Sequence, residues 1–345
     1  MFGASIRGVV ENLFIHQDLN TKWKKRLRGM ILVVVIAIVA HYLGSLFPLV
    51  GGILFAIILG LILGSLWDVS PIYQSGITFV VTKLLKLAVV LLGISLNLNA
   101  IVDIGRQSII VVVTSVILGI ALTYWFGKLL KLDRTLTLMI GIGTSICGTT
   151  AISCVKGILD AKEDETAYAI STIVFFNLIA FFVYPFVGQL LNFNAIDFGI
   201  WSGTAVHDTS SAVAVGFAYS SEAGDVATTV KLARTLFLLP VILILPALMS
   251  NQKKGSVKNS LKNAFPWFIL WFLFMSILNS LGFFSEGLQA FSNDFAKFII
   301  VMVMAAVGLQ VNLKGFVKLG YKPFLTGLFA SVVVSIVSLI MIRFL

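Results

Sequence analysis

Residues 141–151 read GIGTSICGTTA, and this short stretch places three glycines and four hydroxyl side chains inside an apolar segment. The flanking residues, TLTLMI before it and ISCV after it, are those of a hydrophobic helix. In a membrane, irregular backbone is tolerated only where it is buried in protein or lines a cavity. If the chain spans a membrane, the stretch therefore predicts a helix that is broken inside the protein.

The composition indicates a membrane protein. Of the 345 residues 59% are hydrophobic and only 12% are charged, and the mean hydropathy is +1.03. A soluble domain carries about 25% charged residues. The short alternating segments of a membrane β-barrel are not visible. The sequence predicts an all-α, polytopic membrane protein in which a single transmembrane transporter domain, residues 30–345, follows an N-terminal segment, residues 1–29.

Runs of about 18 or more apolar residues are candidates for membrane spans. The chain has eleven such runs, at 30–47, 49–67, 77–97, 108–127, 136–158, 167–190, 199–219, 227–248, 264–281, 293–313 and 323–344.

The distribution of basic residues predicts the orientation, because Lys and Arg accumulate in cytoplasmic loops. They cluster in 1–29 and in the loops 128–134, 250–263 and 314–322, whereas the 282–294 loop has no Lys or Arg. A cytoplasmic N-terminus places all four basic groups inside, so we expect a multi-pass protein of the cell inner membrane. The net charge of +10 is then a consequence of topology, and we expect the lipid bilayer rather than nucleic acid as the partner.

Two weak repeats point to inverted halves. GISLNLNAIVDIG (93–105) aligns with GLQVNLKGFVKLG (308–320), and the orientation above makes the two copies run in opposite directions. Such inverted repeats are typical of secondary transporters, whose substrate site lies near the midplane between them. We place the two repeats at approximately 49–190 and 199–345.

The second repeat contains the opening stretch. GTSICGTTA (143–151) aligns with GTAVHDTSS (203–211), so the 136–158 and 199–219 segments are both interrupted by Gly and hydroxyl residues. Two models remain open. If both segments cross the membrane fully, the copies are parallel; if each is re-entrant, the copies are inverted, as in the first repeat. Close helix packing through small residues is the structural alternative to a binding role for either stretch.

A pair of broken helices near the midplane predicts a site for a small anion, since helix N-termini carry the positive end of the helix dipole. Ionisable residues within membrane spans also indicate function, and Lys231 and Arg234 lie one turn apart in VKLAR. Arg234 suits bidentate binding of an oxyanion, although an ion pair with Asp208 is an alternative. The candidate substrate-binding residues are Thr144, Ser145, Cys147, Gly148, Thr149, His207, Asp208, Thr209, Ser210, Lys231 and Arg234.

Other residues carry weaker predictions. Lys83 and Lys86 lie near the end of their span, where snorkelling to the interface explains both. His207 could couple transport to protons near neutral pH, or could simply bond a neighbouring carbonyl. Cys147 and Cys154 lack the partners of a metal site, so we expect no disulfide, no metal and no cofactor.

At these residues the chain resembles a known family. GTSICGTTA, the VHD of GTAVHDTSSAVAVG and the K-x-x-R of VKLAR together resemble the YeiH-like membrane family, whose members are often labelled sulfate exporters; the similarity runs from about residue 30 to the end. The resemblance also implies a distant relation to the cation/proton antiporter and bile-acid transporter group, which uses inverted five-helix repeats with broken helices at the centre. By that analogy the pathway is lined by Ser145, Cys147, Gly148, Thr149, His207, Asp208, Lys231 and Arg234, and the resemblance implies a homodimer. The different offsets of the two repeats suggest circularly permuted halves, which makes a direct transfer of helix roles doubtful.

The leading hypothesis is a secondary transporter of a small anion, namely sulfate or another sulfur oxyanion or sulfonate, that works by alternating access and is coupled to protons or sodium. No GxxxxGK[ST] motif indicates nucleotide hydrolysis. One alternative is a cation/proton antiporter that uses Asp208. Another is an intramembrane hydrolase in which His207 activates Ser210 or Ser211; Asp208 is poorly placed to orient His207, so we expect no enzyme.

Overall fold

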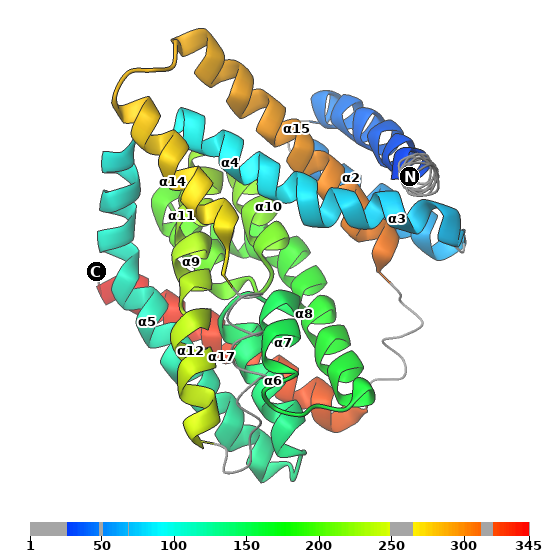
Figure 1. Cartoon of the computed structure of the whole chain (residues 1–345), viewed down its shortest axis with the longest axis vertical. Coiled ribbons are helices and arrows are strands. Elements are labelled where there is room, and N and C mark those ends of the chain that lie inside the picture. Colours follow the sequence, from blue (N-terminus) through cyan, green and yellow to red (C-terminus); the bar gives the residue numbers. More distant parts are fainter. Residues whose placement is uncertain (1–25, 48–50, 68, 249–264, 312–319, 345) are drawn as a thin grey trace, which may run out of the picture. The chain divides into compact units, whose positions relative to one another are not determined.

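The computed structural model describes residues 26–47, 51–67, 69–248, 265–311 and 320–344. Within these residues every regular element is a helix, and seven helices are long and apolar enough to cross a membrane. They are Arg26–Leu46, Pro71–Ser95, Leu98–Leu129, Glu163–Leu190, Ser221–Ile244, Glu286–Gln310 and Tyr321–Phe344. The prediction of an all-α polytopic membrane protein is therefore confirmed (Figure 1).

Each of the eleven predicted segments corresponds to helix. The remaining four are α2 (Gly51–Leu66), the pair α6 (Arg134–Ser145) and α7 (Thr149–Val155), the pair α9 (Ala195–Ala205) and α10 (Thr209–Tyr219), and α14 (Trp267–Ser280). The predictions for the N-terminal basic cluster before Arg26, for the 250–263 loop and for most of the 308–320 repeat lie outside the described residues.

The chain divides into two units, which we describe separately. The first comprises the described residues up to Leu85 together with Phe298–Val311. Inside it, glycines allow helices to touch at the backbone: Gly29 of the helix Arg26–Leu46 lies against Gly76 of α3 (Pro71–Phe79), and Gly60 of α2 lies against Gly308 of α15 (Glu286–Gln310). Contacts between small residues of this kind are characteristic of membrane helices.

The long helix Pro71–Ser95 is not uniform. A π-helical turn, η1 (Val80–Leu84), separates α3 from α4 (Leu85–Ser95). Lys83 and Lys86, which sequence analysis assigned to snorkelling, are both exposed, and the ammonium group of Lys86 lies 5.6 Å from the ring centre of Phe268. Neither lysine belongs to the buried set of charged residues.

The second unit comprises Lys86–Lys297 and the C-terminal helix α17 (Tyr321–Phe344). Side chains fix where its helices begin. Asn97 caps α5 (Leu98–Leu129), Asp133 caps α6, Asn194 caps α9 and Ser220 caps α11 (Ser221–Leu236), each by accepting a backbone N–H of the first turn. Helix α8 (Glu163–Leu190) starts with three acidic residues, which suit the positive end of its dipole.

The 136–158 segment folds as a hairpin. Helix α6 ends at Ser145 and α7 begins at Thr149. Gly143 of α6 lies against the side chain of Ile152 of α7, and these two positions are almost equally distant from the break. Helix α7 therefore turns back beside α6 instead of continuing along its axis.

The 199–219 segment is also a hairpin. Phe198, near the start of α9, stacks on Tyr219, the last residue of α10, with ring centres 3.8 Å apart. The Tyr219 hydroxyl donates a hydrogen bond to the Phe193 carbonyl at 2.6 Å. The two ends of the segment thus lie together, and the break at 206–208 forms the tip of the hairpin.

Helix α8 shows that the two hairpins enter from opposite ends. Lys156, just after α7, pairs with Glu163 at the start of α8 at 3.0 Å. At the other end of α8, Gly188 lies against the rings of Phe198 and Tyr219. A 28-residue helix is about 42 Å long. Of the two models that the sequence leaves open, the structure shows the re-entrant one.

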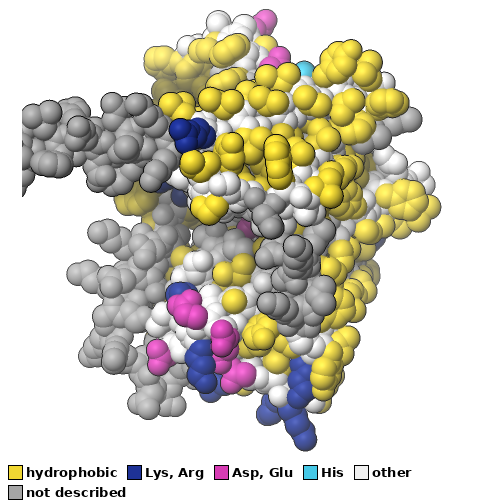
Figure 2. Space-filling view, turned by 90° about the vertical axis from the view of Figure 1, so that its right-hand side faces the viewer, with side chains coloured by type: hydrophobic (Ala, Val, Ile, Leu, Met, Phe, Trp, Pro, Cys, Tyr) yellow, Lys and Arg dark blue, Asp and Glu magenta, His cyan; other side chains and the backbone are white. Residues whose placement is uncertain are grey.

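The surface is strongly apolar. Large hydrophobic side chains are exposed along every long helix, among them Ile31, Ile117, Phe186 and Ile336. Figure 2 shows broad apolar areas on one face, with charged side chains gathered in small groups. A surface of this kind is stable only against lipid, so the molecule is a membrane protein.

Candidate functional site

The tips of the two hairpins touch. Gly148, the last residue before α7, has φ +66°, a conformation that favours glycine. A Cβ at Gly148 would lie 2.8 Å from Oδ1 of Asp208 and 3.1 Å from its Cα. Glycine is thus required here both by its backbone conformation and by the close approach of the second hairpin. We call the contact region, residues 144–153 and 204–211, the crossing.

Asp208 joins the two hairpins through its carboxylate. It precedes the first residue of α10 and accepts hydrogen bonds from Oγ of Ser210 at 2.8 Å and from Oγ1 of Thr149 at 3.3 Å. Its backbone N–H donates to Oδ1 of Asn177 at 3.2 Å, and the amide of Asn177 donates to Oγ of Ser211 at 2.9 Å. Asn177 therefore anchors the tip of the second hairpin to helix α8.

Arg234 of α11 binds both hairpins from behind. Its Nε donates to the Ser145 carbonyl at 2.7 Å and its Nη2 to the Thr144 carbonyl at 2.6 Å. Its Nη1 donates to the carbonyls of Thr204 and, at 3.3 Å, Val206. These carbonyls belong to the last turns of α6 and α9. Because both helices end at the break, the carbonyls have no partner within the helix and carry the negative end of the helix dipole. Arg234 supplies both the donors and the compensating charge.

Lys231, one turn earlier on α11, acts on the second hairpin. Its ammonium group donates to the carbonyl of Val206 at 2.7 Å and to that of His207. The side chains of Lys231 and Arg234 are both completely buried. A buried charge is tolerated only when it is hydrogen-bonded, and the backbone of the two breaks provides that compensation.

Two buried cations thus face one half-buried carboxylate. The ion pair between Arg234 and Asp208 that the sequence left open is replaced, among the described residues, by bonds from Arg234 to backbone carbonyls. The described hydrogen bonds of Lys231 and Arg234 point at backbone rather than at open space. Their contribution to a bound anion would therefore be their charge rather than direct contact.

All eleven predicted site residues lie at the crossing or on the face of α11 behind it, but they differ in accessibility. Thr149, Asp208 and Thr209 are half-buried, and Thr150 and Ser153 beside them are exposed. The others are buried: Thr144, Ser145, Cys147, Gly148, His207, Ser210, Lys231 and Arg234. A ligand that approaches the crossing would first meet the hydroxyls of the accessible group.

His207 has a different partner from the one the hydrolase alternative needs. Its Nε2 lies 2.8 Å from Oγ of Ser331 on α17. Ser210 donates to Asp208, and Ser211 accepts from Asn177. The arrangement in which His207 activates Ser210 or Ser211 is therefore not present in these hydrogen bonds.

Three residues of the site were absent from the predicted set. Asn177 holds the second hairpin, Ser331 binds His207, and Ser153 lies on the accessible edge. Asn177 could have been found, because an amide in the run AYAISTIVFFNLIAFFVY is costly in a membrane and needs a partner. Ser331 could not, since a serine in an apolar helix can satisfy its hydroxyl on its own backbone.

Comparison with known proteins agrees with the motifs at the crossing. Residues 28–327 match a family model described as conserved hypothetical protein 698. A UPF0324 membrane protein of Clostridium tetani is 35% identical over 331 residues, which cover 91% of this chain and 96% of the relative. A UPF0324 membrane protein of Streptococcus pyogenes serotype M3 is 39% identical over 328 residues, 92% of this chain and 96% of the relative. The chain belongs to the UPF0324 membrane protein family. This is the family that the YeiH-like motifs predicted.

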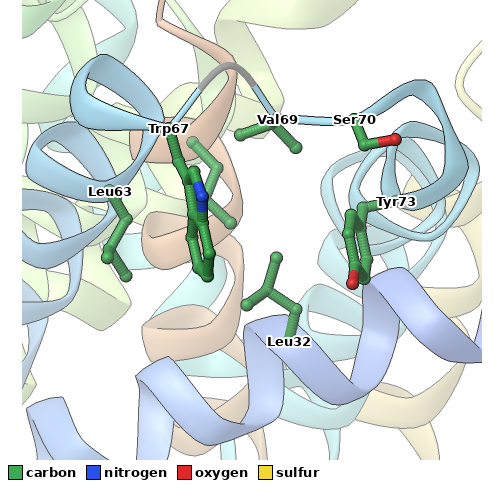
Figure 3. Close-up of a pocket in the computed structure, with 7 residues that line it drawn as sticks. Leu32, Leu63, Trp67, Val69, Ser70 and Tyr73 are labelled. Carbon is green, nitrogen blue, oxygen red and sulfur yellow. The ribbon is translucent and has the colours of Figure 1, made fainter.

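The first unit of this UPF0324 protein has a cavity of its own, of about 360 Å³. It is lined by Leu32, Leu63, Trp67, Val69, Ser70, Tyr73 and Leu309. Figure 3 shows the rings of Trp67 and Tyr73 on opposite sides, with Leu32 between them. The seven lining residues that the structure describes include no Lys, Arg, Asp or Glu.

Proposed function

We propose that this UPF0324 protein is a secondary transporter of small anions. The observation that supports the proposal is the charge at the crossing, where two completely buried cations stand against one half-buried carboxylate. Ionisable groups inside membrane segments are costly and usually mark a transport pathway. Broken helices at the centre of inverted repeats are where secondary transporters bind their substrates.

The accessible edge of the crossing suggests what is bound. The hydroxyls of Thr150 and Thr209 can donate hydrogen bonds, and the cations behind them favour negative charge. The hydroxyl of Thr149 donates to Asp208 and that of Ser153 to the Thr149 carbonyl, so these two would have to turn from their present partners to reach a ligand. Oxyanions accept several hydrogen bonds at once. Together with the resemblance to proteins labelled sulfate exporters, this makes sulfate, another sulfur oxyanion or a sulfonate the proposed substrate class.

The mechanism we propose is alternating access. The hairpins enter from opposite ends of α8, so each covers the crossing from one end. Opening one end while the other stays closed would expose the same residues first to one side of the membrane and then to the other. The driving force would be an ion gradient, no covalent chemistry would be needed, and the protein would lie in the cell inner membrane with a cytoplasmic N-terminus.

A second candidate, cation/proton exchange, rests on Asp208. This half-buried carboxylate accepts two hydroxyl hydrogen bonds at the crossing and could bind a cation or a proton. The buried Lys231 and Arg234 argue against it, because their positive charge would repel a cation.

Thermal unfolding in detergent separates the two candidates. The salts would be the sodium salts of sulfate, sulfite, thiosulfate, phosphate and methanesulfonate, with sodium chloride and potassium chloride as references, all at matched ionic strength. An anion at 100 times its dissociation constant should stabilise the wild type by about 2.7 kcal/mol. We expect the Thr149→Val/Thr150→Val double variant to lose most of that shift. The control is Thr82→Val, the same change at an exposed threonine of the other unit, whose hydroxyl donates to the Thr78 carbonyl of its own helix.

The proposal fails if no anion raises the unfolding temperature of the wild type. A rise with sodium alone, abolished by Asp208→Asn, would instead support cation exchange.

A further inference from the structure

The carboxylate of Asp208 occupies a position that a substrate anion would need. It lies at the tip of the second hairpin, holds the hydroxyls of Thr149 and Ser210, and is half-buried among the accessible residues of the crossing. The protein thus places a carboxyl group of its own close to the buried Lys231, at the tips of the two hairpins.

A substrate anion and the ionised Asp208 would compete for this place. Both need the same hydroxyl donors, and two negative charges a few ångströms apart repel each other strongly when they are partly removed from water. A carboxylate relieves this conflict when it takes up a proton, because it then loses its charge and becomes a hydrogen-bond donor itself.

We propose that the crossing binds its anion together with one proton, which resides on the carboxylate of Asp208. This inference rests on the proposed function and names its coupling ion. The proton comes from the aqueous side that is open at that moment and leaves with the anion on the other side; no covalent bond is otherwise made or broken. Because a monoanion and a proton together add no net charge, the loaded and the empty crossing carry the same charge.

The groups around Asp208 make it the best placed proton carrier. The titratable groups that interact with it are Lys231 of α11 and Cys147 of the first hairpin, and His207 precedes it in the chain; α8 contributes the uncharged Asn177. These three titratable groups are buried, whereas Asp208 is half-buried. His207 has its Nε2 next to Ser331 and not next to Asp208. Among the described residues of the crossing, Asp208 is also the only carboxylate.

The test is the pH dependence of anion affinity. Dissociation constants of methanesulfonate and sulfate, which both stay ionised throughout, would be measured from thermal shifts between about pH 5 and pH 8, each against an anion-free reference at the same pH. Uptake of one proton with each anion predicts that affinity rises about tenfold for each unit by which the pH falls, as long as Asp208 is ionised in the empty protein.

Single substitutions test whether the proton binds to Asp208. Asp208→Asn should bind the anion with an affinity that no longer changes with pH and that is at least as high as that of the wild type at low pH. Asp225→Asn is the matched control: it removes a half-buried carboxylate of α11, away from the crossing, and should keep the dependence of the wild type. His207→Gln tests the neighbouring titratable group and should also keep the dependence.

Three results would overturn the inference: an affinity of the wild type that does not change with pH, a dependence that survives in Asp208→Asn, or its loss in His207→Gln alone. The first needs no variant and therefore decides the matter even if Asp208→Asn does not fold. If no anion binds to the wild type or to Asp208→Asn at any pH, the proposed function itself is rejected, and this inference with it.

Discussion

Arg234 shows how a membrane protein keeps a charge in its interior. The sequence presents it as an oxyanion ligand, whereas in the structure its guanidinium bonds carbonyls from both broken helices. The i, i+3 spacing with Lys231 puts the two side chains on one face of α11, as predicted. The sequence alone does not show that this face meets the carbonyl ends of α6 and α9, since that depends on contacts with residues about 90 and about 30 positions earlier in the chain.

We predict that Arg234→Ala destabilises the protein by at least about 3 kcal/mol, because the change leaves several buried carbonyls without a donor. Arg234→Lys should lose less stability, because lysine keeps the positive charge. It should still be less stable than the wild type, because lysine cannot reach both hairpins. Thermal unfolding in detergent measures both. Lys83→Ala, at an exposed lysine, is the control and should change stability by no more than about 0.5 kcal/mol. An unchanged unfolding temperature for Arg234→Ala would contradict the role given to this residue.

Gly148 is the second residue on which the crossing depends. Gly148→Ala should destabilise by about 1–3 kcal/mol, because alanine is strained at φ +66° and its Cβ would press on Asp208. Gly105→Ala is the matched control on α5, where a Cβ has open space and alanine favours the helix, so it should be neutral or stabilising. Equal unfolding temperatures for the two variants would show that the two hairpins do not pack closely at Gly148.

At the scale of the elements, the apolar runs predicted the helices well and their paths less well. Segments such as 108–127 and 167–190 are long, lack Gly-rich interruptions and became α5 and α8. The 136–158 segment is also long enough to span, and its glycines are compatible with a kink or with a reversal. Only contacts such as that of Gly143 with Ile152 decide between these paths, because they pair residues across the break.

The re-entrant paths predict which loops share a side of the membrane. Single cysteines at Lys131 and Lys162, which flank the first hairpin, should be labelled by an impermeant thiol reagent from the same side. Cysteines at Asn192 and Ser220, which flank the second hairpin, should both be labelled from the opposite side. Cys147 and Cys154 are buried, so the wild type gives the background. Labelling of Lys131→Cys and Lys162→Cys from opposite sides would mean that the 136–158 segment crosses fully.

At the scale of the whole molecule, the second unit combines both hairpins, α8 and α11 in one packed body. The motifs GTSICGTTA, VHD and K-x-x-R lie far apart in the sequence and meet at the crossing in this unit. The family membership and the apolar surface establish a membrane protein. Transport of an anion with a proton is our proposal for what the crossing does.

The most direct test of the account is transport by the purified protein in proteoliposomes. We would follow radiolabelled sulfate and methanesulfonate, with and without an imposed pH gradient. The account predicts anion flux above that of empty liposomes, accumulation on the alkaline side, loss of accumulation with a protonophore, and anion exchange without pH-driven accumulation for Asp208→Asn. Absence of flux for every anion tested, in a preparation that unfolds cooperatively, would contradict the central claim.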